Sequence, residues 1–274
     1  MGRSIGVISI KGGVGKTSTV VNLGSTLSHK YGKEVLIVDA NFTAPNLALH
    51  LGIVEPKVSL HDVLRGDADV TKAILKYEKG LYILPCSLLH KRVNPMRLKR
   101  VIDPLKKSFD FIIIDSSPNL NEEMLSTIIS SDEIFVVTTP DYPTLSTTMR
   151  AVKLAKDKGT PINGLILNKV RNQKFELKLD DIEDATGVPV LAVVPDDVNV
   201  LEALSELTPT TLRHLSTDAT VEFNKLGAAL VNENYEDTRF KTKLSNLFGA
   251  RSTKQDLNRA VFKDTRFSQT KFSQ

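Results

Sequence analysis

A glycine-rich segment near the N-terminus carries residue types that bind phosphate. The stretch ISIKGGVGKTST covers residues 8–19. Its last part fits the end of the phosphate-loop pattern G-x-x-x-x-G-K-[ST] at Gly15, Lys16 and Thr17. The first glycine of the pattern falls on Ile10, so the stretch is a variant of that pattern. Its chemistry would be the binding and transfer of a phosphoryl group.

The turn predicted for this stretch places main-chain amides around an anion. A strand that ends at Ile10 and a helix that begins near Lys16 leave the glycines between them. Glycine permits positive φ and close backbone approach, so N–H groups and the helix N-terminus face the phosphates. Lys16 is expected to bridge the terminal phosphates, and the hydroxyl of Thr17 to bind Mg²⁺. The predicted phosphate-binding residues are Gly12, Gly13, Val14, Gly15, Lys16, Thr17 and Ser18.

The elements that position this turn form a repeating pattern. Short, wholly apolar stretches separated by helical patterns are typical of a parallel sheet covered on both faces. Right-handed crossovers then give a doubly wound α/β fold. The predicted strands are 4–10, 35–38, 81–84, 111–114, 134–137, 164–167 and 190–194. The predicted helices are 17–30, 60–75, 144–158 and 221–231.

Polar residues follow most of these strands. Ligands bind at the carboxyl ends of the strands in such a sheet. One or two of the residues could be ordinary loop residues, but the whole set is better explained by one nucleotide site. The residues at the strand ends are Lys11, Asp39, Asp115, Thr138, Asn168, Pro195 and Asp196.

The composition excludes several classes of protein. A chain of 274 residues can bury a full core as one large domain or two small ones. Cys86 is the single cysteine, which excludes a disulfide framework and a metal site made of several thiolates. No stretch approaches the roughly 20 apolar residues of a membrane span, and no secretory signal precedes the first predicted strand. We therefore expect a cytoplasmic protein.

The positive charge is concentrated at the C-terminal end. Residues 238–274 hold nine basic and two acidic residues, a balance of +7. Because the whole chain carries +4, the preceding 237 residues carry −3. A basic tail on a mildly acidic body is typical of contact with nucleic acid or anionic lipid, although merely solvated tails are also common.

The second lysine of the glycine-rich stretch, Lys11, points to a particular family. KGGVGKT resembles the deviant Walker loop KGGxGK[ST] of the MinD/ParA family of P-loop ATPases. In that family the early lysine reaches across a dimer interface to the partner's nucleotide, so the resemblance implies this catalytic role for Lys11 beside Lys16. Such a cation would offset charge on the transferring phosphoryl group. The alternative is a solvated loop lysine, and Ile10 replaces a glycine that is usual in the family.

The resemblance extends over residues 4–230. VLIVDANFTAPNLALHLGI (35–53) resembles the first switch, and FDFIIIDSSP (109–118) resembles the Walker B strand and second switch. GLILNKV (164–170) and VPDDVNVLEAL (194–204) are similar to the segments that hold adenine. The resemblance implies Mg-ATP as cofactor, with Thr17, Asp39 and Asp115 at the metal and Asn168, Pro195 and Asp196 at the base. It also implies a homodimer in the ATP state and an activating protein partner.

One residue departs from the family pattern in the first switch. Family members usually carry D-x-D, and the second aspartate positions the attacking water. This chain has Asp39-Ala40-Asn41. An amide can orient water but cannot accept its proton, so hydrolysis by way of Asn41 is expected to be slow or nearly absent.

The C-terminal residues show a short amphipathic pattern. Phe240, Leu244, Leu247 and Phe248 recur at helical spacing beside basic residues. The stretch about 239–249 resembles the membrane-targeting helix of MinD-type members, which predicts binding to an anionic membrane surface. The alternatives are packing on the body and contact with DNA.

The remaining tail is polar and basic, and it ends in the repeat TRFSQ, TKFSQ. We expect residues 1–232 to form the P-loop ATPase domain and 233–274 a basic tail, disordered over 250–274. Phe267 and Phe272 could anchor a partner or stack on bases.

Three functions compete on this sequence. The first is a MinD-like positioning ATPase that dimerises on ATP and associates with a membrane to position a structure such as the division site. The second is a ParA-like partition ATPase whose ATP dimer binds DNA non-specifically. The third is a scaffold that holds ATP without hydrolysing it. The amphipathic stretch 239–249 and the stretch 59–74, which is similar to a MinD-type helix, favour the first.

Overall fold

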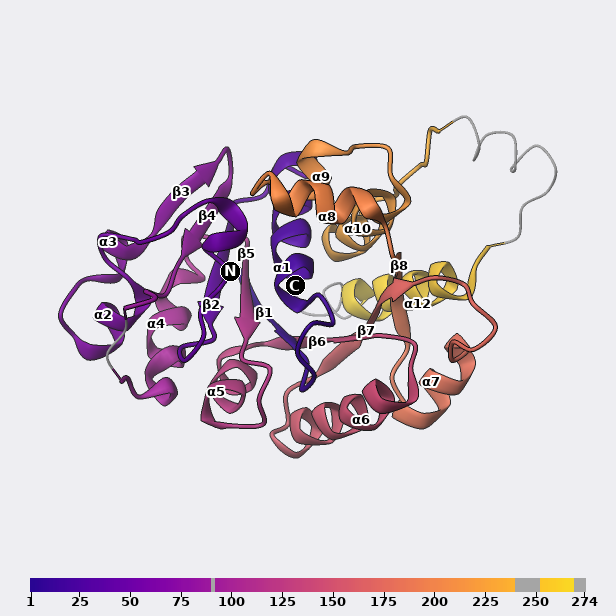
Figure 1. The fold of residues 1–274 in the computed structure, drawn as a ribbon, viewed down its shortest axis with the longest axis horizontal. Helices are drawn as coiled ribbons and strands as arrows, with labels where there is room; N and C mark the ends of the chain where they lie inside the picture. The colour runs from indigo at the N-terminus through magenta and orange to yellow at the C-terminus, as the bar shows by residue number, and fades with distance from the viewer. Residues whose placement is uncertain (90–91, 240–251, 269–274) are drawn as a thin grey trace.

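An eight-stranded sheet in the order β3-β4-β2-β5-β1-β6-β7-β8 forms the centre of the computed structural model (Figure 1). The structure describes residues 1–89, 92–239 and 252–268. All neighbouring strands run parallel except β3, which pairs antiparallel with β4 at one edge. The strands are β1 (Arg3–Ile8), β2 (Val35–Ala40), β3 (Leu75–Glu78), β4 (Leu81–Leu84), β5 (Phe111–Ser116), β6 (Glu133–Thr138), β7 (Ile162–Val170) and β8 (Val190–Pro195).

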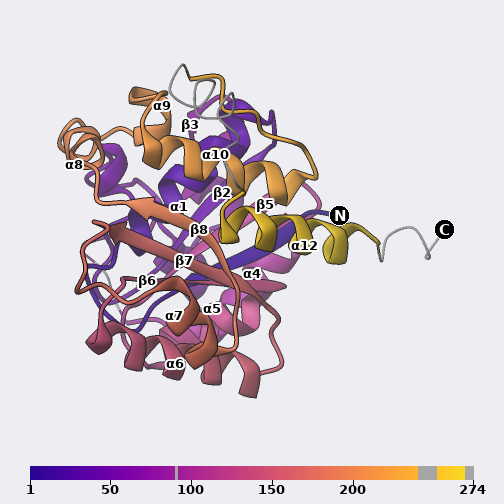
Figure 2. The ribbon, with the colours of Figure 1, turned by 90° about the vertical axis from the view of Figure 1, so that its right-hand side faces the viewer.

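Helices cover both faces of the sheet, as Figure 2 shows. One face carries α1 and α10, and the opposite face carries α5, α6 and α7. The predicted doubly wound α/β fold is therefore confirmed. The helices are α1 (Lys16–Ser25), α2 (Leu60–Arg65), α3 (Val70–Ala73), α4 (Leu98–Leu105), α5 (Glu122–Ser130), α6 (Tyr142–Asp157), α7 (Leu179–Thr186), α8 (Val198–Ser205), α9 (Thr210–Arg213), α10 (Asp218–Val231) and α12 (Lys254–Ser268).

The central strands are buried because side chains on both of their faces meet helices. Every residue of β2, β5 and β6 is buried. In β1, Ile5 and Val7 join the core beneath α1, while Ile8 joins the core beneath α5 and α6. This double burial explains why these strands are continuous apolar runs in the sequence.

Several predicted elements have different bounds in the structure. The predicted helix 60–75 is two short helices, because Gly66 takes a left-handed conformation (φ 89°) and ends α2, and Leu75 already belongs to β3. The predicted strand 4–10 ends at Ile8, so the glycine-rich turn begins earlier. The helix predicted over 17–30 continues beyond α1 as a π-helical turn over Thr26–Lys30.

The disorder predicted for 250–274 is wrong over residues 254–268. These residues form α12, which packs against β8 and α10 (Figures 1 and 2). The polar composition did not indicate a docked helix, because α12 docks through buried ion pairs and not through a large apolar face. Arg259, for example, is only 5% exposed. The predicted amphipathic stretch 239–249 lies outside the described residues except for Arg239.

None of the helices in the described residues combines the length and apolar character needed to cross a bilayer.

Candidate nucleotide site

The glycine-rich turn joins the end of β1 to the start of α1 at the carboxyl edge of the sheet. Gly15 stands directly before α1 with φ 91°, and Gly13 has φ 77°. These left-handed conformations are why glycine occupies both positions. A Cβ placed on Gly12 or Gly13 would meet no atom within 4 Å, so the turn borders open space. The first amides of α1 therefore face a space that can take an anion.

Lys16 and Thr17 meet an acidic residue from a distant strand. Lys16 Nζ lies 2.5 Å from Asp115 Oδ1, and Thr17 Oγ1 donates to Asp115 Oδ2 at 2.7 Å. Asp115 is fully buried on β5. The structure thus brings together three residues that sequence reasoning placed at phosphate and metal.

A second buried carboxylate lies beside the first. Asp39 on β2 is the register partner of Asp115 on β5. Burial, and after it the neighbouring charge of Asp115, raises the pKa of Asp39 above its ordinary value, while the amides of Leu47 and Asn41 and the charge of Lys16 act in the opposite direction. Two adjacent buried carboxyl groups favour a cation between or beside them, and in this structure the ammonium of Lys16 supplies one.

Residues 41–47, in the stretch that resembles the first switch, surround the carboxylate of Asp39. The amides of Asn46 and Leu47 donate to Asp39 Oδ2 at 3.1 and 3.0 Å, and the amide of Asn41 donates to Oδ1 at 3.0 Å. The side-chain amide of Asn41 donates to the carbonyl of Ala44. Asn41 is therefore held by its own loop while it borders the cavity described below.

The opposite wall of the turn comes from the end of β7. Asn168 Nδ2 donates to the carbonyl of Val14 at 2.8 Å, and Lys169 Nζ donates to the carbonyl of Gly13 at 2.8 Å. A Cβ on Gly15 would lie 2.1 Å from Asn168 Nδ2. The glycine is therefore required both by its backbone conformation and by this close approach.

A cavity of about 310 Å³ extends from the turn to the end of β8. All the predicted phosphate-binding residues line it, as do Asn41, Asn168, Pro195 and Asp196. Asp196 also forms an ion pair with Arg171 at 2.6 Å. The residues predicted for the phosphate end and the base end thus border one continuous space.

Comparison with known proteins identifies the family. Residues 2–159, more than half of the chain, match the family described as "AAA domain". The chain is similar to an uncharacterized ATP-binding protein of Methanocaldococcus jannaschii, with 33% identity over 92% of this chain and 98% of the relative. It is also similar to the cell division ATPase MinD of Pyrococcus furiosus, with 35% identity and a TM-score of 0.80 over 85% of this chain and 99% of that one. The chain belongs to the MinD/ParA family of P-loop ATPases.

The similarity to MinD holds for a second structure. MinD of Pyrococcus horikoshii, solved in complex with Mg-ADP, is 34% identical with a TM-score of 0.79, covering 84% of this chain and 96% of that one. The resemblance read from KGGVGKT is therefore confirmed, and the protein is a MinD-like ATPase.

Lys11, the signature lysine of this MinD-like ATPase, contacts α6 in the structure. Its Nζ lies 2.7 Å from Thr144 Oγ1 and 3.3 Å from Asp141 Oδ1. Burial raises the pKa of Asp141, but hydrogen bonds from Thr139, Thr144 and Lys11 outweigh it and bring the pKa to about 2. Lys11 is therefore not a lone solvated lysine, and its action on a partner's nucleotide stays a prediction.

Several cavity residues of this MinD-like ATPase escaped the sequence reasoning. Asn46 accepts a hydrogen bond from Thr17 Oγ1 at 3.2 Å, and Lys169 follows the predicted Asn168. Both lie within the stretches 35–53 and 164–170 that resemble family segments, so the resemblance itself could have indicated them. Three apolar cavity residues of α8 also lie within a stretch that resembles a family segment, 194–204, although none was predicted as a contact; they are Val200, Leu201 and Leu204. Phe223 of α10 carries no such signal, because its apolar character fits any helix.

The residues present fit Mg-ATP. The turn offers amides, an ammonium and a hydroxyl, which suit phosphates, and Asp39 and Asp115 offer the oxygens that Mg²⁺ prefers. The described residues hold no group of three or more His, Cys, Asp or Glu that could hold a metal by themselves. A Mg²⁺ ion here would therefore depend on phosphate oxygens and water as well as on protein oxygens.

Proposed function

We propose that this protein binds Mg-ATP, dimerises around the nucleotide and uses that dimer to control its association with a membrane surface, as a MinD-like positioning ATPase. The observation that carries the proposal is the single cavity that joins the glycine-rich turn to the end of β8. Its two ends offer different chemistry, cationic and amide-rich at one and apolar at the other, which suits the triphosphate and base of one nucleotide.

The residues take distinct roles in this function. The amides of residues 12–18 hold the phosphates, Lys16 neutralises the terminal ones, and Thr17 with Asp39 and Asp115 supports Mg²⁺ and its water. Mg²⁺ supplies neutralisation of the phosphate charge. Asn41 orients the attacking water, and because an amide cannot take a proton, hydrolysis is slow and depends on an activating protein partner.

Exposed apolar residues near the cavity mouth support the proposed dimerisation. Val198 and Leu201 of α8 are 73% and 62% exposed, and Leu120, two residues after the cavity residue Pro118, is 58% exposed. Leu201 also lines the cavity. Exposed apolar groups beside a ligand site support a protein interface there. A second copy would cover these groups and bring its Lys11 to the nucleotide of the first.

Membrane association is assigned to the stretch 239–249. A short basic amphipathic helix binds anionic headgroups weakly as one copy. Two copies in a dimer bind far more strongly because the second binding event becomes intramolecular. ATP-dependent dimerisation would therefore become ATP-dependent membrane association.

The test combines size-exclusion chromatography with vesicle co-sedimentation, with Mg-ATP, with ADP and without nucleotide. We expect a dimer bound to anionic vesicles only with Mg-ATP. Lys11→Ala should abolish the dimer, and Lys153→Ala, which removes an exposed lysine of α6, should leave it intact. Leu244→Glu should abolish vesicle binding without changing the dimer.

Other outcomes would replace this proposal. A wild-type protein that stays monomeric with Mg-ATP, or a dimer that survives Lys11→Ala, would contradict the dimer switch. Salt-sensitive binding of the ATP dimer to any DNA sequence, without vesicle binding, would show the ParA-like function instead.

A further inference from the structure

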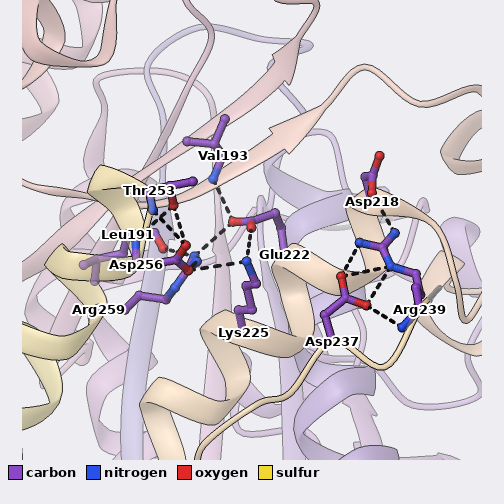
Figure 3. Close-up of polar contacts among 10 residues, drawn as sticks. All are labelled: Leu191, Val193, Asp218, Glu222, Lys225, Asp237, Arg239, Thr253, Asp256 and Arg259. Carbon is purple, nitrogen blue, oxygen red and sulfur yellow. Dashed lines mark hydrogen bonds and ion pairs between the residues drawn. The ribbon is translucent and has the colours of Figure 1, made fainter. Parts of the chain in front are cut away.

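Helix α12 is joined to the sheet by an arginine with almost no exposed surface. Arg259 donates to the carbonyl of Leu191 at 2.7 Å and to Glu222 Oε2 at 2.9 Å (Figure 3). It also contacts Asp256, one turn earlier on its own helix. Glu222 belongs to α10, so one guanidinium connects α12, α10 and β8. A buried guanidinium is stable only while its acceptors stay in place, so these three elements are held together.

Side chains around Arg259 also supply hydrogen-bond partners for main-chain groups at the free edge of the sheet. β8 is the last strand of the sheet, and no strand of the described residues pairs with its outward main-chain groups. The amide of Val193 donates to Glu222 at 3.2 Å, and the amide of Val190 donates to Glu183 of α7 at 2.6 Å. Asn258 of α12 donates to the carbonyl of Val190 at 2.9 Å. Side chains of α7, α10 and α12 therefore fix the position of an edge strand that could otherwise shift.

Both elements that Arg259 holds lead directly into the cavity. Val193 is followed along β8 by Val194 and Pro195, which line the cavity. Glu222 is followed on α10 by Phe223, which lines it as well. The contacts of Arg259 are therefore made to the same strand and the same helix that supply the apolar wall of the nucleotide site.

We propose that Arg259 is a positioning residue for the nucleotide base. By fixing β8 and α10, it sets the cavity wall formed by Val194, Pro195 and Phe223. The proposal rests on the proposed function, because that function places the base at this wall. The phosphate turn joins β1 to α1, and Arg259 contacts neither of these elements, so phosphate binding should depend on Arg259 much less than base binding does.

A reciprocal effect follows from this coupling. If docked α12 favours the binding of ATP, then bound ATP stabilises docked α12 by the same factor. The chain from Arg239 to Thr253 connects α10 to α12, and Arg239 is itself held by Asp237 and by Asp218 at 2.6 Å (Figure 3). The nucleotide site would thus be linked to Arg239 and to Thr253, the two ends of this connection.

The test compares two ligands that share phosphates but not a base. Isothermal calorimetry on the full chain would measure the Kd of Mg-ATP and of Mg-tripolyphosphate. Arg259→Gln should raise the Kd of Mg-ATP by about fivefold or more, which is at the lower end of coupling factors between two binding sites. The Kd of tripolyphosphate should change by less than about twofold, since general destabilisation would affect both ligands. Unchanged affinity for ATP, or an equal loss for both ligands, would overturn the proposal.

Two further variants distinguish a positioning role of Arg259 from a general effect on the stability of the fold. Arg259→Lys keeps a cation that can reach one acceptor, so it should recover part of the ATP affinity. Lys263→Ala removes contacts of the same helix with Glu233 and Asn234, which lie beyond the end of α10 and away from the cavity. This variant should bind ATP like the wild type, and weakened binding in it would also contradict a specific role for Arg259.

A measurement on the unmodified protein covers the case in which Arg259→Gln does not fold. Hydrogen exchange of α12 amides should slow with Mg-ATP but not with Mg-tripolyphosphate, while residues 12–18 should be protected by both. If ATP protects residues 12–18 but does not slow the exchange of the α12 amides, the inference about Arg259 is overturned while the proposed function still stands. If neither ligand protects residues 12–18, the proposed function itself fails.

Discussion

At the scale of single residues, the site depends on a few side chains that each bind more than one neighbour. Asp115 accepts from both Lys16 and Thr17, and Asp39 accepts from three amides of the first switch. Asn168 touches the turn where only a glycine fits. Such sharing makes the site sensitive to substitutions that leave the fold intact.

Gly15→Ala tests the closest of these contacts. The new methyl group would occupy a left-handed backbone position and press on Asn168. We expect a loss of about 1–3 kcal/mol of stability and a large loss of nucleotide affinity. Gly32→Ala is the matched control, since Gly32 also has positive φ (61°) but nothing lies within 4 Å. Gly32→Ala should lower the stability by about 1–2 kcal/mol and leave nucleotide affinity unchanged. Thermal unfolding measures the stability, and titration calorimetry measures the affinity. Equal effects on affinity would show that the contact with Asn168 is unimportant.

Asn41→Asp tests the departure in the first switch. An aspartate cannot donate to the carbonyl of Ala44, which releases the side chain from its own loop, and it can accept a proton from water. We expect single-turnover hydrolysis of ATP to become about a hundredfold faster, at the lower end of general-base contributions. Asn41→Ala should not accelerate the reaction. An unchanged rate in Asn41→Asp would remove the explanation for slow turnover.

At the scale of elements, α12 shows how a polar helix can dock on a body without a large apolar face. Burial raises the pKa of Asp256, but hydrogen bonds from Thr253 and Arg259 outweigh this effect and lower the pKa to about 2. Its side chain is 31% exposed, so solvent screens part of the interaction. The docking of α12 therefore depends on the ionised form of a carboxyl group that sits at the start of the helix.

This dependence predicts an acid-sensitive contribution to stability. Because the folded pKa lies below the ordinary value of 3.8, the contribution is present above about pH 4 and is lost as the pH falls toward 2. Asp256→Asn should lower the free energy of unfolding by about 1 kcal/mol at pH 7. The difference from the wild type should narrow between pH 4 and pH 3 in denaturant unfolding curves. A difference that stays constant from pH 7 to pH 3 would contradict this role.

At the scale of the whole molecule, the two edges of the sheet differ in what covers them. At one edge, β3 turns back antiparallel on β4. At the other, β8 is covered by side chains of α7, α10 and α12. Under the proposed function, a second copy would cover the exposed apolar residues near the cavity mouth, which lie at neither of these two edges.

Much of this arrangement was predictable from the sequence because it depends on local patterns. Continuous apolar runs require burial on both faces, which predicts a parallel sheet, and polar residues at strand ends then meet at one edge. KGGVGKT requires glycine for its backbone angles, which identified the phosphate turn. For these reasons Lys16, Thr17, Asp39, Asp115 and Asn168 were all predicted near one another.

Only the tertiary structure decided the rest, because the deciding contacts join residues far apart in the chain. The helix at 254–268 has a polar sequence typical of disorder, and it is ordered by partners such as Glu222 and Leu191, which no local pattern reveals. The apolar wall at Phe223 and Leu201 likewise depends on how α10 and α8 pack against the end of β8. Local sequence sets which backbone angles and burial are possible, whereas the pairing of buried charges across the fold exists only once the chain is folded.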